Sequence, residues 1–106
     1  MAKYLIRASY TQEGLQGLLK DGGTKRRAVV EKMAKGLGGT LESFYYAFGE
    51  DDLVSIMDMP DNVTAAAASL MVTAAGGATT SITVLLTPEE VDQAAHKSVA
   101  YTAPGQ

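Results

Sequence analysis

The sequence predicts an α+β fold with a single antiparallel four-stranded sheet and helices on one of its faces. Two strand-like segments, 40–48 and 52–59, meet at a short turn in the middle of the chain. A strand and a helical segment precede this hairpin, and a helix and a strand follow it. The order is therefore β-α-β-β-α-β with one more helix at the C-terminus, which is the split βαβ or ferredoxin-like arrangement.

The first half of the chain supplies a strand and two helical pieces. Residues 3–10 alternate as a half-buried strand does. Thr11 is the expected N-cap of the next helix, in which leucines recur at helical spacing. Glycines at 22–23 interrupt this helix, Thr24 offers a second N-cap, and glycines within 36–39 end the second piece.

The central hairpin begins with an aromatic-rich strand, as residue preferences for half-buried strands favour. Residues 49–51, Gly-Glu-Asp, form its turn, and Pro60 ends its second strand. Asp61 or Asn62 is the expected cap of an alanine-rich helix that buries Val63, Ala66, Ala67, Leu70 and Ala74.

The C-terminal part contains the fourth strand, at about 79–86, and a strong helix start. Thr87 and Glu90 have the spacing of a capping box, and Pro88 occupies the first helical position. The last helix has only a weak apolar stripe, and the tail at 101–105 is expected to be irregular.

The two faces of the sheet are expected to differ. One face, with Tyr4, Ile6, Ala8, Val54 and Ile56, is expected to pack beneath the helices. The opposite face then carries Leu5, Arg7, Ser9, Leu53, Ser55, Met57 and Thr83. This second set is too apolar for free exposure and too polar for a dry core. Burial against the same face of a second copy would resolve the conflict and give a barrel-like homodimer.

Length and composition narrow the possible classes of protein. Residues 1–106 fit one domain with a modest core. The net charge of −3 provides no basic surface for a nucleic acid, and the chain has no cysteine. The most apolar stretch, 63–75, is too short for a membrane span, and residues 1–10 do not have the basic-then-apolar pattern expected of a signal peptide. A cytoplasmic protein with no membrane or nucleic-acid partner is expected.

Two sets of residues resemble the GYD-domain family of small bacterial proteins over nearly the whole chain. The first set is Tyr10-Thr11, Gly14, Arg26-Arg27 and Gly38-Gly39 before an aromatic strand, and the second is Gly49-x-x-Asp52 followed by Val54, Ile56 and Pro60-Asp61. The family name denotes a Gly-Tyr-Asp tripeptide at the turn, where this chain has Asp51 in the tyrosine position.

That family is similar to the dimeric α/β-barrel superfamily, so the resemblance implies the ferredoxin-like fold and the pairing of two copies. It implies no particular activity. The superfamily includes cofactor-independent monooxygenases, haem-degrading enzymes, decyclising isomerases and proteins that only bind ligands, and fold alone does not choose among them.

Charged side chains offer the first candidate binding residues. Arg26 and Arg27 lie in the first turn of a helical piece, where cations oppose the helix dipole. This placement indicates either an ion pair with a carboxylate such as Asp21 or an anionic ligand. Arg7 lies on the sheet face that is expected to be buried, so it needs a carboxylate or a ligand anion as partner.

His96, Tyr45 and Ser55 complete the candidate set. His96 is the only histidine and is a candidate general base or haem ligand, or else a solvated residue near a helix end. Tyr45 and Tyr46 point to opposite faces of their strand, so only one can line a binding site; Tyr45 is taken as the ligand-binding candidate. Ser55 is a ligand-binding candidate on the same face as Arg7.

Two functional hypotheses follow. The first is a homodimeric small-molecule-binding or assembly module without chemistry of its own. The second is a cofactor-independent enzyme, monooxygenase-like or isomerase-like, that acts on a small aromatic or carbonyl compound with Arg7, Tyr45 and His96 at the pocket. No paired acid–base constellation, metal-ligand pattern or cofactor fingerprint occurs in the chain, so neither a metal nor a cofactor is expected.

Overall fold

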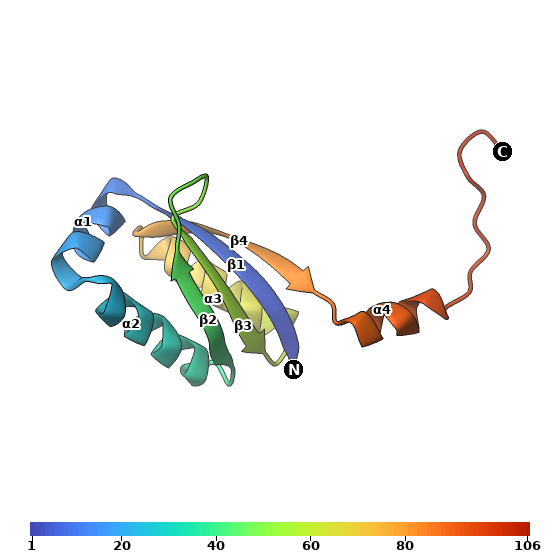
Figure 1. Ribbon diagram of the computed structural model, residues 1–106, viewed down its shortest axis with the longest axis horizontal. Coiled ribbons are helices and arrows are strands. Elements are labelled where there is room, and N and C mark those ends of the chain that lie inside the picture. Colours follow the sequence, from blue (N-terminus) through green and yellow to red (C-terminus); the bar gives the residue numbers. More distant parts are fainter.

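A computed structural model describes residues 1–106 as one four-stranded antiparallel sheet with helices on one face, followed by a projecting C-terminal helix (Figure 1). The strand order is β2-β3-β1-β4, so the predicted ferredoxin-like fold is confirmed. The elements are β1 (Ala2–Tyr10), α1 (Gln12–Asp21), α2 (Gly23–Gly36), β2 (Thr40–Tyr46), β3 (Leu53–Met59), α3 (Asn62–Ala74), β4 (Ala78–Leu85) and α4 (Pro88–Ala95). None of the helices combines the length and the apolar character needed to cross a bilayer.

The helix starts follow the capping residues of the sequence, with one exception. Thr11, Asp61 and Thr87 cap α1, α3 and α4 as predicted, and α4 has the full capping box. Thr24 does not cap α2, because the helix already begins at Gly23. The break between α1 and α2 lies at Gly22, whose φ of 85° is a conformation that glycine adopts without steric cost.

The inner face of the sheet contains the core, and its register corrects the predicted faces of β3. Tyr4, Ile6 and Ala8 lie beneath the helices as expected, but their partners in β3 are Met57, Ser55 and Leu53. Val54 and Ile56 were expected there and point to the outer face instead. Both faces of β3 are partly apolar, so alternation alone could not fix its phase.

The buried face of α3 also differs from the prediction. Ala65 and Ala68 are its buried residues, whereas Val63 and Leu70 are exposed. Small side chains allow a helix to lie close to a sheet, so the alanines occupy the contact and the larger residues remain outside. The hydroxyl of Tyr4 donates a hydrogen bond to Asn62 Oδ1 over 2.6 Å and ties the start of α3 to the sheet.

The outer face of the sheet has an apolar centre with charges at both ends. Leu5 lies opposite Ile56 in the ladder, and Arg7 lies opposite Val54. At one end Lys3 Nζ contacts Glu42 at 2.7 Å and Asp58 at 3.0 Å. These two hydrogen bonds raise the pKa of Lys3 above its usual value.

The C-terminal arm, residues 86–106, projects away from the sheet (Figure 1). Every residue of α4 and of the tail after it is exposed. The radius of gyration is 17.0 Å, whereas a compact chain of this length has a value of about 13 Å. The arm therefore accounts for the elongated shape.

Candidate functional site

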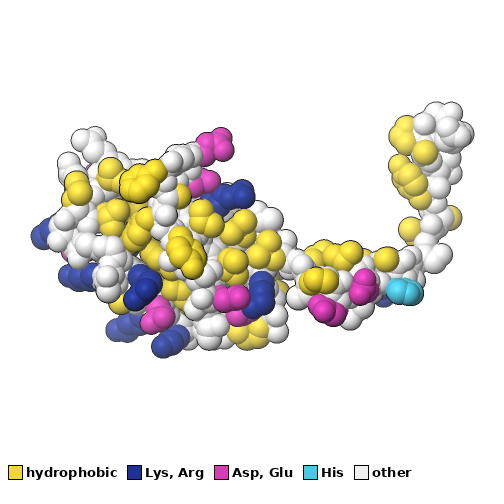
Figure 2. Space-filling view, in the orientation of Figure 1, with side chains coloured by type: hydrophobic (Ala, Val, Ile, Leu, Met, Phe, Trp, Pro, Cys, Tyr) yellow, Lys and Arg dark blue, Asp and Glu magenta, His cyan; other side chains and the backbone are white.

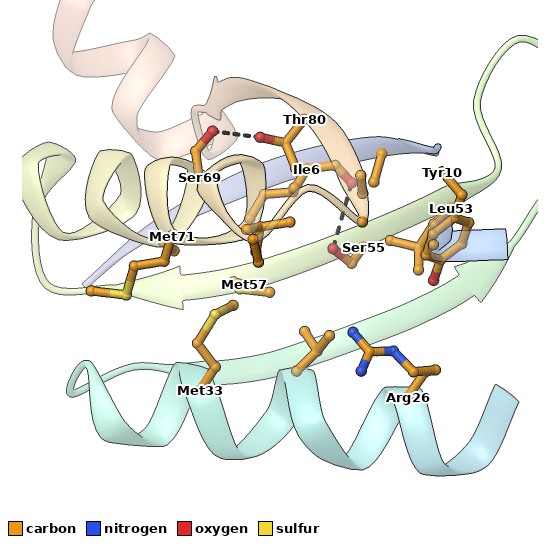
Figure 3. Close-up of a pocket in the computed structure, with 18 of the residues that line it drawn as sticks. Ile6, Tyr10, Arg26, Met33, Leu53, Ser55, Met57, Ser69, Met71 and Thr80 are labelled. Atoms are coloured by element: carbon orange, nitrogen blue, oxygen red, sulfur yellow. Dashed lines mark hydrogen bonds between the residues drawn. The ribbon is translucent and has the colours of Figure 1, made fainter. Parts of the chain in front are cut away.

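A cavity of about 440 Å³ lies between the inner face of the sheet and the helices. Its floor comes from β1, β3 and β4, and its walls come from α1, α2 and α3. Figure 3 shows α2 and α3 on opposite sides of the lining residues. Most of the lining is apolar. The side chains used below are Tyr10, Arg26, Met33, Ser55, Met57, Ser69, Met71 and Thr80.

Two of the lining residues are glycines in close contact, Gly14 and Gly77. A Cβ atom on Gly14 would lie 1.8 Å from the carbonyl oxygen of Gly77, so only glycine permits this approach of α1 to the α3–β4 turn. Thr11 secures the same crossing, because its amide donates to the Gly77 carbonyl at 3.0 Å and its hydroxyl donates to the Gly76 carbonyl at 2.8 Å. The contact holds two walls of the cavity at a fixed separation.

Arg26 is the cation of this cavity. Figure 3 shows its guanidinium pointing from α2 towards the sheet. It forms no salt bridge, since the aspartate that also lines the cavity, Asp21, pairs with Lys25 at 3.6 Å. The predicted pairing of Arg26 with a carboxylate is therefore not observed, and its charge faces an apolar space.

Tyr10 lies near Arg26 and keeps its proton. Burial raises the pKa of Tyr10 to about 12, with the neighbouring Tyr46 adding to the effect and Arg26 opposing it. A phenol with this pKa is a hydrogen-bond donor at neutral pH and not a base. Sequence reasoning missed Tyr10 as a site residue because its alternation with Tyr4 and Ile6 indicated only a core position.

Ser55 and two further hydroxyls provide the remaining polar atoms. Ser55 is buried on the inner face, opposite to its predicted side, and its Oγ donates to the carbonyl of Ile6 at 3.5 Å. Ser69 of α3 and Thr80 of β4 hydrogen-bond to each other (Figure 3). These hydroxyls already have partners within the protein, so they offer a ligand mainly acceptor lone pairs.

The other predicted site residues lie elsewhere. Arg7 and Tyr45 share the outer face, where both flank Val54 in the ladder, so their Cα atoms are about 10 Å apart. The Arg7 Nε atom lies 3.9 Å from Asp51 Oδ2, and the Tyr45 side chain is 70% exposed. His96 ends α4 on the arm, with Nδ1 2.6 Å from the Asp92 carbonyl.

The structure therefore separates the five candidates into three places. Arg26 and Ser55 meet at the cavity, and Arg7 and Tyr45 meet on the outer face. His96 ends α4, a helix that stands apart from the sheet (Figure 1). Tyr45 and Tyr46 point to opposite faces of the sheet, as predicted from their adjacent positions in the strand. Tyr46 packs edge-on against Phe44 and donates from its hydroxyl to the carbonyl of Gly23 at 3.0 Å.

The comparison with protein families places the whole folded region in one family. A family model for the GYD domain matches residues 4–95 of the 106-residue chain. The chain belongs to the GYD-domain family. No curated protein and no solved structure matches this GYD domain significantly.

The aspartate of the family turn has a structural role in this GYD domain. Asp52 Oδ2 accepts a hydrogen bond from the Tyr10 amide at 2.8 Å, and the Asp52 amide donates to the Ala8 carbonyl at 2.9 Å. The turn thus secures the end of β1 that carries Tyr10 to the cavity. The neighbouring Asp51 accepts a hydrogen bond from Ser9 Oγ at 3.4 Å and contacts Arg7, so its carboxylate lies on the outer face.

Proposed function

We propose that this GYD domain is a homodimeric small-molecule-binding module whose cavity holds an amphipathic ligand with an anionic group. The observation that supports this function is the unpaired Arg26 beside the neutral phenol of Tyr10, at an otherwise mostly apolar cavity. The volume of about 440 Å³ lies within the range of small-ligand sites. The predicted location remains the cytoplasm.

The polar end of the cavity suits a carboxylate or a similar oxyanion. A guanidinium binds a carboxylate with two parallel hydrogen bonds, and a phenol adds a third donor. The local backbone contributes rigidity, because Tyr10 is tied to Asp52 and the α1 wall is fixed at Gly14. Donors held in place in this way lose little freedom when a ligand binds.

The apolar part of the cavity suits a flexible or planar hydrocarbon body. Met33, Met57 and Met71 line it from α2, β3 and α3 (Figure 3). Methionine side chains adapt to differently shaped partners because they are unbranched and polarisable. We therefore expect tolerance in the hydrocarbon body and selectivity for the charged group.

The outer sheet face supports the homodimer within this proposal. Leu5, Val54 and Ile56 form an apolar centre, and Arg7 and Lys3 stand at its two ends beside carboxylates. Pairing of this face with its own copy would cover the apolar centre and leave the ion pairs at the rim.

A cofactor-independent enzyme has less support as the function. Catalysis with Arg7, Tyr45 and His96 requires these side chains at one pocket, and the chain holds His96 on the arm instead. Tyr10 keeps its proton at neutral pH, so it does not serve as a general base in the cavity.

The test uses two neighbouring arginines with different surroundings. Arg26→Gln should weaken binding of medium-chain carboxylates by about 10-fold to 100-fold, the equivalent of one lost hydrogen bond to a charged group. Binding of the matched primary alcohols should change little. Arg27→Gln is the control, because Arg27 is exposed on the same helix and does not line the cavity.

Isothermal titration of the purified chain with carboxylates and alcohols of six to about twelve carbons measures both effects. Equal losses in the two variants would place binding on the surface of α2 and not in the cavity. A folded protein that binds none of these carboxylates would contradict the proposed ligand class.

A further inference from the structure

The C-terminal arm carries a short helix that its own chain leaves uncovered. α4 has eight residues, and isolated helices shorter than about 12–15 residues are marginal in water. Its capping box supplies part of the stability. The rest of helical stability normally comes from packing an apolar face, and every residue of α4 is exposed.

The helix α4 is amphipathic, and all of its charged side chains are acidic. Val91, Ala94 and Ala95 recur at i, i+3 and i+4 and form an apolar stripe. Glu89, Glu90 and Asp92 are its charged residues, and it has no lysine or arginine. Figure 2 shows hydrophobic side chains along one side of this helix and acidic side chains along the other.

α2 presents the complementary surface. Its sequence, GTKRRAVVEKMAKG, has five basic residues and one acidic residue. Ala28 and Val29 are exposed between Lys25 and Lys32, so an apolar patch stands between cations. α3 has an exposed apolar face but no charged residue, so it has no cation to pair with the acidic side of α4. α1 has one lysine against two acidic residues.

We propose that α4 packs on α2 of a second copy, with its apolar stripe on Ala28 and Val29 and its carboxylates beside the flanking lysines. The family match extends to Ala95, the last residue of α4. α4 is therefore part of the domain and not an appended tail. Two arms exchanged in this way give a closed, two-fold symmetric pair.

The arrangement of the sheet is compatible with this exchange. If two sheets faced each other about an axis parallel to their strands, β4 of one copy would lie over β2 of the other. The arm leaves β4 at Leu85, which the ladder places level with Thr40 at the start of β2. α2 ends close to this point, at Gly36. The arm exchange does not require this sheet pairing, and the experiment below separates the two.

Engineered cysteines test the contact directly, because the chain contains none of its own. Full-length Val91→Cys and Val29→Cys proteins are mixed and oxidised mildly, and the disulfide-linked heterodimer is quantified on non-reducing gels. We expect several-fold more product than from Val91→Cys mixed with Val63→Cys, a valine on α3 that is more exposed (79%) than Val29 (45%) and would therefore cross-link more readily if exposure alone decided. Val91→Cys is also mixed with Tyr45→Cys, and a disulfide between these two proteins would indicate that the arm lies on the outer face of the sheet.

Each alternative has its own signature. Preferential cross-linking to Val63→Cys or Tyr45→Cys, or a monomeric product from the double variant Val29→Cys/Val91→Cys, would overturn the proposal. Light scattering on the unmodified chain measures whether it is a dimer at all. If the chain is dimeric but residues 29 and 91 do not cross-link, the arm exchange is wrong, while the proposed sheet pairing still stands.

Charge reversal provides a second readout that does not depend on cysteine geometry. Glu89→Lys/Asp92→Lys should weaken self-association at least tenfold, as should Lys25→Glu/Lys32→Glu, and their mixture should recover it. Glu90 is left unchanged because it belongs to the capping box. If the mixture of the two variants does not recover association, the proposed pairing of acidic α4 with basic α2 is wrong.

Discussion

Single side chains at the glycine crossing decide whether the cavity walls can assemble. Gly14→Ala places a methyl group against the Gly77 carbonyl and should destabilise the fold by about 1–3 kcal/mol or more. Gly17→Ala, one turn later in α1, has nothing within 4 Å and should stabilise the helix by about 0.5–1 kcal/mol. Urea unfolding of both variants measures the contrast, and equal effects would refute the role of the crossing.

Tyr10 gives a prediction at alkaline pH. Its folded pKa of about 12 exceeds the usual value of 10.0, so its contribution to stability is fully present below about pH 10 and is lost as the pH rises towards 12. The Tyr10→Phe variant should therefore lose less stability than the natural chain as the pH rises from about 10 to about 12. Ultraviolet titration should likewise lose its most alkaline tyrosine step in the variant; an unchanged titration would mean that another tyrosine is responsible.

Sequence reasoning about single residues favours side chains with uncommon chemistry and overlooks those that resemble ordinary core residues. Arg26 is recognisable in the sequence as a cation at a helix start, and in the structure it lines the cavity. Tyr10 is not recognisable in this way, because a phenol in an alternating strand resembles any core aromatic. Ser55 was selected for a face that it does not occupy, although the residue does line the cavity.

Among the elements, α3 depends on its N-cap. Asp61 accepts hydrogen bonds from the Thr64 hydroxyl at 2.7 Å and from the Thr64 amide at 2.8 Å, and these bonds lower its pKa below 3.8. The contribution of Asp61 to the stability of the folded state is therefore present at neutral pH, and it is lost as the pH falls through the pKa that Asp61 has in the folded protein. Asp61→Ala should lower the thermal midpoint at neutral pH, and the difference from the natural chain should narrow in acid.

Asp61→Asn is the matched control, because asparagine caps helices without titrating in this range. Circular dichroism melts of the three proteins at neutral and acidic pH provide the comparison. A difference between Asp61→Ala and the natural chain that persists unchanged in acid would contradict a contribution from the charged carboxylate.

Element boundaries followed from local signals, whereas element faces required the tertiary structure. Glycines, proline and capping residues act within one turn, so they locate ends without knowledge of the fold. The faces of β3 and α3 were predicted wrongly, since hydrophobicity alone favours Val54 and Leu70 for the core. The ladder supplies the missing information: Asp58 lies opposite Lys3, which fixes the charged face of β3.

For the whole molecule, the order of the elements predicted the fold, but not the space between the helices. Cavity volume depends on how far two walls stand apart, and this distance is set by long-range contacts such as Gly14 with Gly77. The predicted irregular tail agrees with the structure, as residues 97–106 form no helix or strand. The sequence did not predict that α4 projects away from the sheet.

The arm and the body should be separable in a truncation experiment. All buried residues of the two hydrophobic clusters lie between Tyr4 and Ala78. A chain that ends at Thr87 should therefore retain its unfolding free energy as a monomer to within about 0.5 kcal/mol. Its dimer dissociation constant should rise at least tenfold in sedimentation experiments. Unfolding of the truncated monomer would show that the arm stabilises its own body.

The two edges of the sheet are protected unequally. β2 has a bulge between Leu41 and Ser43, and the intervening Glu42 places a charge there; both features discourage another strand from adding to an edge. β4, ATTSITVL, has neither a charge nor a proline. The risk of amyloid-like strand addition is therefore concentrated on one side of the molecule, so an assembly that shields β4 also protects the protein from aggregation.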